Sequence, residues 1–341
     1  MTPEAHTAAP DFSEQALESY LRQQIGALEG PMRINRIAGG QSNPTYFVTF
    51  GHRHLVMRKQ PPGKLLPSAH AVDREHRVMS ALAGTAVPVP PMVLYCADAN
   101  IIGTPFYIME RVEGRIFHDC TLPGIKPAER REMYRAMAQT LAALHTVNIA
   151  TTGLGNYGKS GNYFARQIAR WSKQWELSRT RDDQNVERLI AWLPLNVPSD
   201  DMTSLVHGDY RIGNLMFHPA GPDVAAVLDW ELSTLGHPLA DVAHTAIAWL
   251  TAAGEYGGLI GVDIDALGIP PLDQFIDDYN AVAGTPLTLT NFHKAFALFR
   301  WTIIFEGIAA RARAGNAAAG NAAEMGTLAG IFAQRANALI G

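Results

Sequence analysis

The chain has 341 residues, of which 47% are hydrophobic and 18% are charged. This composition supports a buried core and excludes a disordered chain, and the length suits two lobes better than one domain. The formal net charge of −4 argues against nucleic acid as a partner, because neutralising phosphates requires a basic surface. Two cysteines, Cys96 and Cys120, are too few for a disulfide framework and fit a reducing cytosol.

The N-terminal residues, MTPEAHTAAPDFSEQ, lack the basic and apolar regions of a signal peptide. No uninterrupted apolar run reaches the roughly 18 residues that a membrane-spanning helix needs. We therefore expect a cytoplasmic protein with no membrane partner. The sequence leaves its oligomeric state open.

The N-terminal part, residues 1–112, combines helical and strand patterns. Apolar residues at helical spacing predict an amphipathic helix over 13–28. After it, the sequence predicts two strands around a glycine-rich turn, a third strand ending near Arg58, a helix over 70–84, and two strands over 92–98 and 104–112. These elements predict a compact α+β lobe, with a five-stranded antiparallel sheet and a helix.

The C-terminal part, residues 113–341, is predicted to be mainly helical. Helices are expected over 128–147, 162–178 and 186–194, followed by a strand over 223–230 and further helices to the end. Glycines inside AARARAGNAAAGNAAEMG predict a break in that segment. We place the lobe boundary after residue 112, because the composition changes there without a long linker.

The stretch HGDYRIGNLMF, residues 207–217, carries the strongest chemical pattern. His207, Asp209 and Asn214 fit H-x-D-x-x-x-x-N, the spacing of a kinase catalytic loop. In such a loop the Asp aligns or deprotonates the substrate hydroxyl, and the Asn turns back to bind a metal ion. The alternative is a polar turn closed by an Asx hydrogen bond.

A second carboxylate follows at a fitting distance along the chain. Asp229 lies fifteen residues after Asn214, at the end of the apolar strand pattern AAVLDW. An Asp in that place can present a carboxylate to Mg²⁺ that bridges the β- and γ-phosphates. Glu231 points to the same side of an extended chain and is a candidate metal-linked or substrate-contacting carboxylate. A strand-end Asp in an ordinary turn is the alternative.

The N-terminal part supplies candidate phosphate-binding groups. A glycine-rich turn lies between two strand patterns and could cradle phosphates with its backbone N–H groups; its residues are Gly39, Gly40, Gln41, Ser42 and Asn43. Arg58 ends the third strand and could reach the α- and β-phosphates, with Glu75 on the next helix as its partner. Lys59 competes with Arg58, since strand alternation lets only one of them face the cleft. A plain hairpin and a surface ion pair are the alternatives.

With these motifs in this order, the chain resembles the aminoglycoside phosphotransferase and choline kinase superfamily, which has a bilobal protein-kinase-like fold. The resemblance covers most of residues 30–312 and is most specific in HGDYRIGNLMF and LDWELSTLGHPLADVA. NYFARQIARWSKQW and FEGIAAR are similar to a branch whose kinase-like domains stand alone in bacteria or are fused to acyl-CoA dehydrogenases. The resemblance implies an enzyme that uses ATP and Mg²⁺ to phosphorylate an alcohol.

The resemblance also assigns roles to individual residues. Asp209 would be the base or hydroxyl-positioning group, with His207 and Arg58 as further catalytic residues, and Asn214 and Asp229 would hold Mg²⁺. Adenine would bind a hinge through the Glu110 carbonyl and the Val112 N–H. Asp241 would be structural and would bond the backbone of the catalytic loop. The chain departs from relatives at His237, where they often have Asp.

The acceptor is less defined by the sequence. Aminoglycosides are polycations, and the nearest carboxylate cluster, Asp273, Asp277 and Asp278, fits a solvated helix face equally well. Arg166, Arg170 and Lys173 form a basic stripe that could bind an anionic acceptor or could simply be solvated.

We therefore expect a kinase for a small-molecule hydroxyl, such as a hydroxyacyl-CoA or another anionic metabolite, with a functional link to acyl-CoA metabolism. An aminoglycoside kinase and a catalytically silent nucleotide-binding module are the alternatives.

Overall fold

The computed structural model describes residues 5–6, 10–37, 43–63, 70–313 and 322–341. The chain divides into two compact units. Unit 1 comprises Met1–Ile116, Met216–Pro219 and Ala225–Glu231, and unit 2 comprises Phe117–Leu215, Ala220–Val224 and Leu232–Gly341. Short later segments therefore return to unit 1, a feature that a single boundary after residue 112 does not describe.

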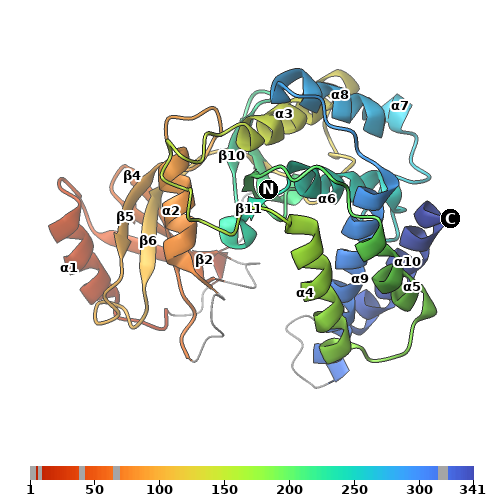
Figure 1. Ribbon diagram of the computed structural model, residues 1–341. Coiled ribbons are helices and arrows are strands. Elements are labelled where there is room, and N and C mark those ends of the chain that lie inside the picture. Colours follow the sequence, from red (N-terminus) through yellow and green to blue (C-terminus); the bar gives the residue numbers. More distant parts are fainter. Residues whose placement is uncertain (1–4, 7–9, 38–42, 64–69, 314–321) are drawn as a thin grey trace. The chain divides into compact units, whose positions relative to one another are not determined.

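Unit 1 is built on an antiparallel sheet of strand order β1-β2-β3-β4-β6-β5 (Figure 1). The five predicted strands are present, and the α+β fold class is confirmed. The short β1 adds a sixth strand at the β2 edge, where Ala5 pairs with Ile37. The elements are β1 (Ala5–His6), α1 (Glu14–Gln24), β2 (Met32–Ile37), β3 (Thr45–Phe50), β4 (Arg53–Lys59), α2 (Val72–Leu82), β5 (Met92–Cys96) and β6 (Phe106–Glu110).

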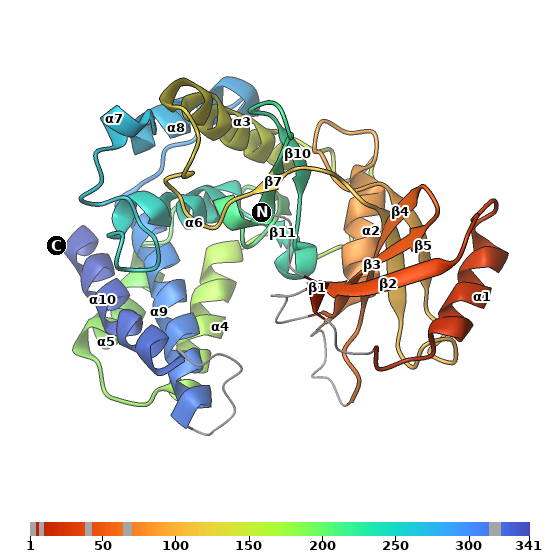
Figure 2. The same cartoon turned by 180° about the vertical axis from the view of Figure 1, so that it is seen from behind.

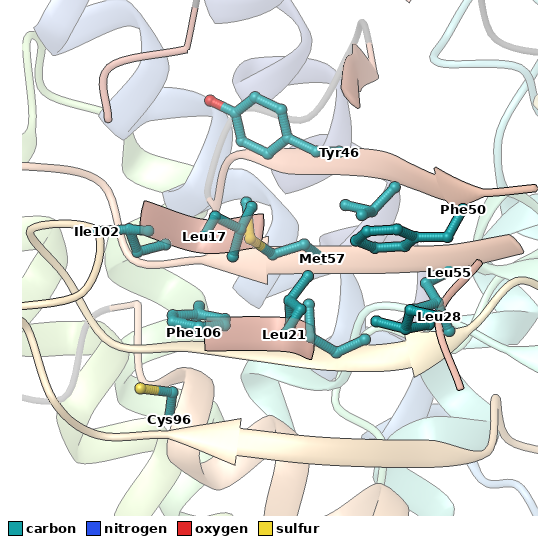
Figure 3. Packing of buried hydrophobic residues seen from close by; sticks show 12 residues of the cluster. Leu17, Leu21, Leu28, Tyr46, Phe50, Leu55, Met57, Cys96, Ile102 and Phe106 are labelled. Atoms are coloured by element: carbon teal, nitrogen blue, oxygen red, sulfur yellow. The ribbon is translucent and has the colours of Figure 1, made fainter. Parts of the chain in front are cut away.

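The main hydrophobic core of unit 1 lies between α1 and one face of this sheet. Figure 3 shows Leu17 and Leu21 of α1 against inward-pointing residues such as Phe50, Met57 and Phe106. Each such side chain contributes roughly 1.5–3 kcal/mol when it leaves water. This packing fixes the sheet that carries the charged groups on its opposite face.

Strand alternation sends neighbouring residues of β4 to opposite faces. Met57 and Lys59 face α1, where the Lys59 ammonium lies 2.7 Å from Asp11. Arg58 faces α2 and contacts Glu75. The structure thus resolves the competition between the two cations in favour of Arg58.

A second, smaller sheet of order β10-β9-β7 contains the returning segments. Arg115 pairs with Phe217 and Ile116 pairs with Met216. A Cβ on Gly114 would lie 2.6 Å from the Phe217 carbonyl oxygen, so only glycine fits there. The strands are β7 (Arg115–Ile116), β9 (Leu215–Phe217) and β10 (Val224–Val227).

Unit 2 is mainly helical, as predicted, and α9 packs against several of its helices (Figure 2). The neighbours of α9 are α4, α5, α6 and α10, while α3 pairs with α8. The helices are α3 (Pro127–His145), α4 (Tyr163–Ser178), α5 (Gln184–Trp192), α6 (Pro238–Leu250), α7 (Ile264–Leu267), α8 (Leu272–Ala283), α9 (Asn291–Arg313) and α10 (Ala322–Ile340). The predicted break in the alanine-rich segment falls on residues outside the described ranges.

Helix α6 is buried on all sides over Pro238–Ile247. A helix in such surroundings must be apolar or must pair its polar groups. Two of its polar residues, Asp241 and His244, therefore need partners, and both find them in the segment that follows β8. That strand (Ser204–Val206) pairs with β11 (Thr234–Gly236) and leads directly into the predicted catalytic loop.

None of the described helices combines the length and the apolar character needed to cross a membrane.

Candidate active site

Asp241 holds the start of the loop at residues 207–217. Its carboxylate accepts hydrogen bonds from the backbone N–H of His207 at 2.6 Å and of Gly208 at 2.8 Å. Burial would raise the pKa of Asp241, but His145 and the loop donors lower it overall, so the group stays ionised. Gly208 has φ +85°, and a Cβ there would lie 2.6 Å from the Leu232 carbonyl oxygen. The loop backbone is therefore fixed by a buried carboxylate and a required glycine.

His207 was predicted to be catalytic, and the structure places it in a supporting position. Its side chain is fully buried, and Nδ1 accepts a hydrogen bond from the Asp209 backbone N–H at 3.2 Å. An imidazole that lies beneath the loop cannot contact a substrate. His207 supports the backbone that presents Asp209.

The Asp209 carboxylate is held from two sides. The Asn214 amide donates to Oδ2 and to the Asp209 backbone carbonyl, both at 2.8 Å, and Arg211 lies 3.5 Å from Oδ2. His244 Nε2 lies 2.9 Å from Oδ1. Burial would raise the pKa of Asp209, but His244, Arg211 and His207 lower it overall. Asp209 is therefore a carboxylate at neutral pH, with a fixed orientation.

Sequence reasoning missed His244 as a partner of Asp209; it considered Trp301 only as an aromatic residue that could line an acceptor pocket or belong to the core. His244 lies thirty-five positions from Asp209, and Trp301 Nε1 donates to His244 Nδ1 at 3.3 Å. Burial lowers the pKa of His244, against the opposing effect of Asp209. One signal was available: His244 follows Asp241 at i+3 in an otherwise apolar helix, so both polar groups lie on one face.

A cavity of about 620 Å³ opens beside this loop within unit 2. Aromatic residues dominate its wall, namely Tyr134, Trp249, Tyr256 and Trp301, and His244 and Arg211 connect it to Asp209. Cys120 also lines it, but burial raises the pKa of that thiol to about 11, so it is not a nucleophile at neutral pH. The cavity has the size and character of a small-molecule site.

In unit 1, Glu75 is the centre of a buried polar network. Its carboxylate accepts from Asn43 at 2.7 Å and from Tyr107 at 3.0 Å, and it lies 3.1 Å from Arg58 Nε. The predicted Arg58–Glu75 pair is therefore present, and it is buried, unlike a surface ion pair. Burial raises the pKa of Glu75, and Arg58 opposes that shift.

Arg58 also reaches the carboxylates that follow β10. Its guanidinium lies 2.9 Å from Asp229 and 3.8 Å from Glu231. Burial would lower the pKa of Arg58, but Glu75 and Asp229 raise it overall, so it remains a cation. Asp229 has φ +64°, a left-handed conformation that is rare for a residue other than glycine and recurs at functional sites.

These groups border a second cavity, of about 230 Å³, within unit 1. Its wall includes Arg58, Glu75 and Asp229 together with the hinge candidates Glu110 and Val112. The Glu110 N–H donates to the Pro91 carbonyl. In a strand the N–H and the C=O of one residue point to the same edge, so the Glu110 carbonyl also points to the edge that faces Pro91. Among the predicted nucleotide contacts, Arg58, Glu75, Glu110 and Val112 thus border one cavity.

The glycine-rich turn and the basic residues of α4 were also predicted to bind ligands. Gly39, Gly40, Gln41 and Ser42 lie outside the described residues, whereas their neighbour Asn43 bonds Glu75. Arg166 donates to the carbonyls of Lys159 and Ser160, and Arg170 lies over the Trp171 ring. Neither Arg166 nor Arg170 borders the 620 Å³ cavity, so the structure does not support them as acceptor ligands.

The two-unit α+β and helical architecture, with a strand cation paired to a helix carboxylate and an Asp–Asn loop, defines a phosphotransferase with a kinase-like fold. Residues 33–282 match the model of the phosphotransferase enzyme family, and the chain belongs to that family.

Solved structures agree with this assignment. A protein described as a putative aminoglycoside phosphotransferase from Ralstonia eutropha is 44% identical, with a TM-score of 0.89 over 96% of this chain and 98% of that one. A thermostable mutant of the aminoglycoside phosphotransferase APH(4)-Ia, in a ternary complex with AMP-PNP and hygromycin B, is 15% identical with a TM-score of 0.60 over 94% of this chain and 98% of that one. The latter likeness concerns the fold alone.

Other similar proteins are named as acyl-CoA dehydrogenase family members. Acyl-CoA dehydrogenase family member 10 of Mus musculus is 44% identical over 327 residues, which cover 95% of this chain and 31% of that protein. Acyl-CoA dehydrogenase family member 11 of Homo sapiens is 40% identical over 319 residues, which cover 89% of this chain and 40% of that protein. The chain therefore spans about a third to two-fifths of the length of these relatives.

Proposed function

We propose that this protein transfers the γ-phosphoryl group of ATP to the hydroxyl of a small molecule, with Asp209 positioning that hydroxyl. The observation that carries the proposal is the Asp209 carboxylate, held by Asn214 and His244 next to an aromatic cavity of about 620 Å³. Phosphoryl transfer needs mainly positioning and charge stabilisation, which a fixed carboxylate supplies at the acceptor oxygen. Asp209 would accept the hydroxyl proton as the hydroxyl oxygen bonds to the γ-phosphorus and the bond from that phosphorus to the β–γ bridging oxygen breaks, which releases ADP.

The 230 Å³ cavity of unit 1 would take the nucleotide. Its hinge residues offer a carbonyl at Glu110 and an N–H at Val112 for adenine, and Arg58 offers a fixed cation for the α- and β-phosphates. Glu75 would keep the guanidinium in place. Support from outside this chain comes from the AMP-PNP complex of APH(4)-Ia, which has the same fold.

Asn214 of unit 2 and Asp229 of unit 1 would be the ligands of Mg²⁺. The donor types fit, because Mg²⁺ prefers carboxylate and carbonyl oxygens and usually takes only one or two protein carboxylates alongside phosphates. Asn214 uses its amide nitrogen on Asp209, so its carbonyl oxygen would be the ligand atom. Bound Mg²⁺ would neutralise phosphate charge.

The cavity wall favours an acceptor that is apolar in part and neutral or anionic. Asp119 is the one carboxylate among the described lining residues, whereas Arg211 and His118 offer positive or donor groups. A polycationic aminoglycoside would meet few counter-charges there. A hydroxyacyl-CoA or a similar hydroxylated anion fits better, and the names of the curated relatives point to the same chemistry.

The test is a screen for ATP-dependent phosphorylation, with hydroxyacyl-CoA esters and hydroxy acids in one arm and hygromycin B with other aminoglycosides in the other. Phosphorylated product detected by mass spectrometry in the first arm supports the proposal. Product in the second arm alone would establish the aminoglycoside kinase instead. ADP release with no product in either arm would favour a nucleotide-binding module that phosphorylates no acceptor.

A matched pair of substitutions tests the role of the cavity. Arg211→Met removes the cation that borders the cavity, and Arg170→Met removes an exposed cation of α4 that does not. Loss of a charge-assisted contact of about 1.5–3 kcal/mol corresponds to roughly a 10- to 100-fold higher KM for an anionic acceptor. Arg170→Met should leave that KM unchanged. Equal effects of the two substitutions would contradict the assignment of the acceptor to this cavity.

A further inference from the structure

His244 links the cavity wall to the Asp209 carboxylate. Its Nε2 lies 2.9 Å from Asp209 Oδ1, and its Nδ1 lies 3.3 Å from the indole Nε1 of Trp301. Both His244 and Trp301 border the 620 Å³ cavity. His244 comes from α6 and contacts the carboxylate, and Trp301 comes from α9 and contacts the other ring nitrogen of His244.

The chemistry of the donors assigns the imidazole tautomer. An indole N–H can only donate, so the Nδ1 that faces it must carry a lone pair. The proton of a neutral imidazole then resides on Nε2 and is directed at Asp209. An imidazolium, or the opposite tautomer, would place an N–H against the indole N–H. Trp301 therefore selects the imidazole form that donates to the carboxylate.

The two oxygens of Asp209 are held by different elements. Oδ2 accepts hydrogen bonds from Asn214 and Arg211, which belong to the loop itself, whereas Oδ1 accepts one from His244 of α6. Contacts at one oxygen still allow the carboxylate plane to rotate about its terminal torsion, which is soft. A donor at the other oxygen removes that freedom.

We propose that His244 is a positioning residue for Asp209 and that Trp301 fixes the His244 tautomer. The wall that receives the acceptor would thereby also orient the carboxylate that engages its hydroxyl. This inference rests on the proposed function for its catalytic consequence, but the tautomer can be measured without any acceptor.

Nitrogen-15 NMR of the full chain tests the tautomer directly. At neutral pH, His244 should show a protonated Nε2 and an unprotonated Nδ1, with His244→Gln providing the assignment. Trp301→Phe should abolish this single tautomer. The matched control is Trp249→Phe, which removes another indole of the same cavity whose N–H donates to the Pro270 carbonyl, and it should leave the His244 signals unchanged. A proton on Nδ1 in the unsubstituted protein would overturn the proposal.

Steady-state ADP release from MgATP, with water as the phosphoryl acceptor, tests the positioning role. His244→Leu should lower kcat by roughly 100-fold with little change in the KM for ATP, the scale expected when a reacting group is misplaced. His244→Gln retains an N–H donor and should recover most of that loss. Circular dichroism would verify that both variants fold. Equal rates for the Leu and Gln variants would contradict the role of the donated hydrogen bond.

A double-mutant cycle then distinguishes coupling from a general packing effect. Trp301→Phe should lower kcat by about tenfold in the unsubstituted protein and should have no further effect in the His244→Leu background. The same loss in both backgrounds would show that Trp301 does not act through His244. If Asp209→Ala left ADP release unchanged, the proposed function would fail while the NMR result on the tautomer would still stand.

Discussion

Replacement of Glu75 by leucine tests the polar network of unit 1 most severely. The Glu75 side chain is 1% exposed, and that of its partner Arg58 is 15% exposed, so the substitution leaves a buried guanidinium without its main counter-charge. Breaking a buried pair in this way costs about 3–5 kcal/mol. Asn43 and Tyr107 lose their acceptor as well, at about 1–3 kcal/mol each, although such effects overlap and do not add fully.

The expected loss in the unfolding free energy of unit 1 is therefore about 4 kcal/mol or more. Glu75→Gln keeps the shape and one acceptor oxygen and should cost about half as much. The informative variant is the pair Arg58→Met with Glu75→Leu. It also removes the guanidinium that would otherwise lie buried with only Asp229 and Glu231 as counter-charges, so it should recover much of the stability. That double variant should still fail to bind ATP, since the phosphate-binding cation is gone.

Urea unfolding and hydrogen exchange at β4 and α2 would report stability, and calorimetry would report ATP affinity. A loss below about 1 kcal/mol for Glu75→Leu would show that this pair contributes no more than a surface ion pair does. A double variant less stable than Glu75→Leu would contradict the expected recovery of stability.

Three other outcomes follow from the geometry. Asp229→Ala should lose the Mg²⁺-dependent part of ATP binding in calorimetry. If Mg²⁺ leaves the ATP affinity unchanged both in the unsubstituted protein and in Asp229→Ala, Asp229 is not a Mg²⁺ ligand. Asp241→Asn places an amide donor against the His207 or Gly208 N–H and should cost about 1–3 kcal/mol in urea unfolding as well as most activity; a fully active, equally stable variant would contradict the assigned role. Burial lowers the pKa of His293 from 6.5 to about 4, so as pH falls the unfolded chain binds this proton first, and the unfolding free energy should decline by up to about 3 kcal/mol between pH 6.5 and 4. His293→Phe should weaken the dependence of the unfolding free energy on pH between pH 6.5 and 4. An unchanged dependence would show that His293 is not the group responsible.

Strand alternation and motif order were sufficient to predict much of unit 1. The sequence favoured Arg58 over Lys59, although alternation alone states that the two diverge and not which one faces the apolar helix. Packing of α1 against Met57 made that choice. Asp241 was predicted through the family resemblance, and its two bonds to the loop are present.

The missing part of the site depends on contacts distant in sequence. His244 and Trp301 are far from Asp209 along the chain. They come together at Asp209 only because α6 and α9 pack against each other. Arg166 and Arg170, predicted as acceptor contacts, do not line the 620 Å³ cavity, for the converse reason. Helical spacing shows that residues share a face, but it does not show what that face meets, and α4 directs Arg166 toward backbone carbonyls.

In the proposed reaction, Asp209 positions a hydroxyl for attack on the γ-phosphate of ATP. Transfer of radiolabelled γ-phosphoryl from ATP to a hydroxyacyl-CoA ester, measured for the unsubstituted protein and for Asp209→Asn, tests it most directly. Asparagine keeps the size of the side chain but cannot accept the proton, so labelled product should fall by at least about 100-fold while ATP affinity is retained. Labelled product at an unchanged rate in Asp209→Asn would contradict the account.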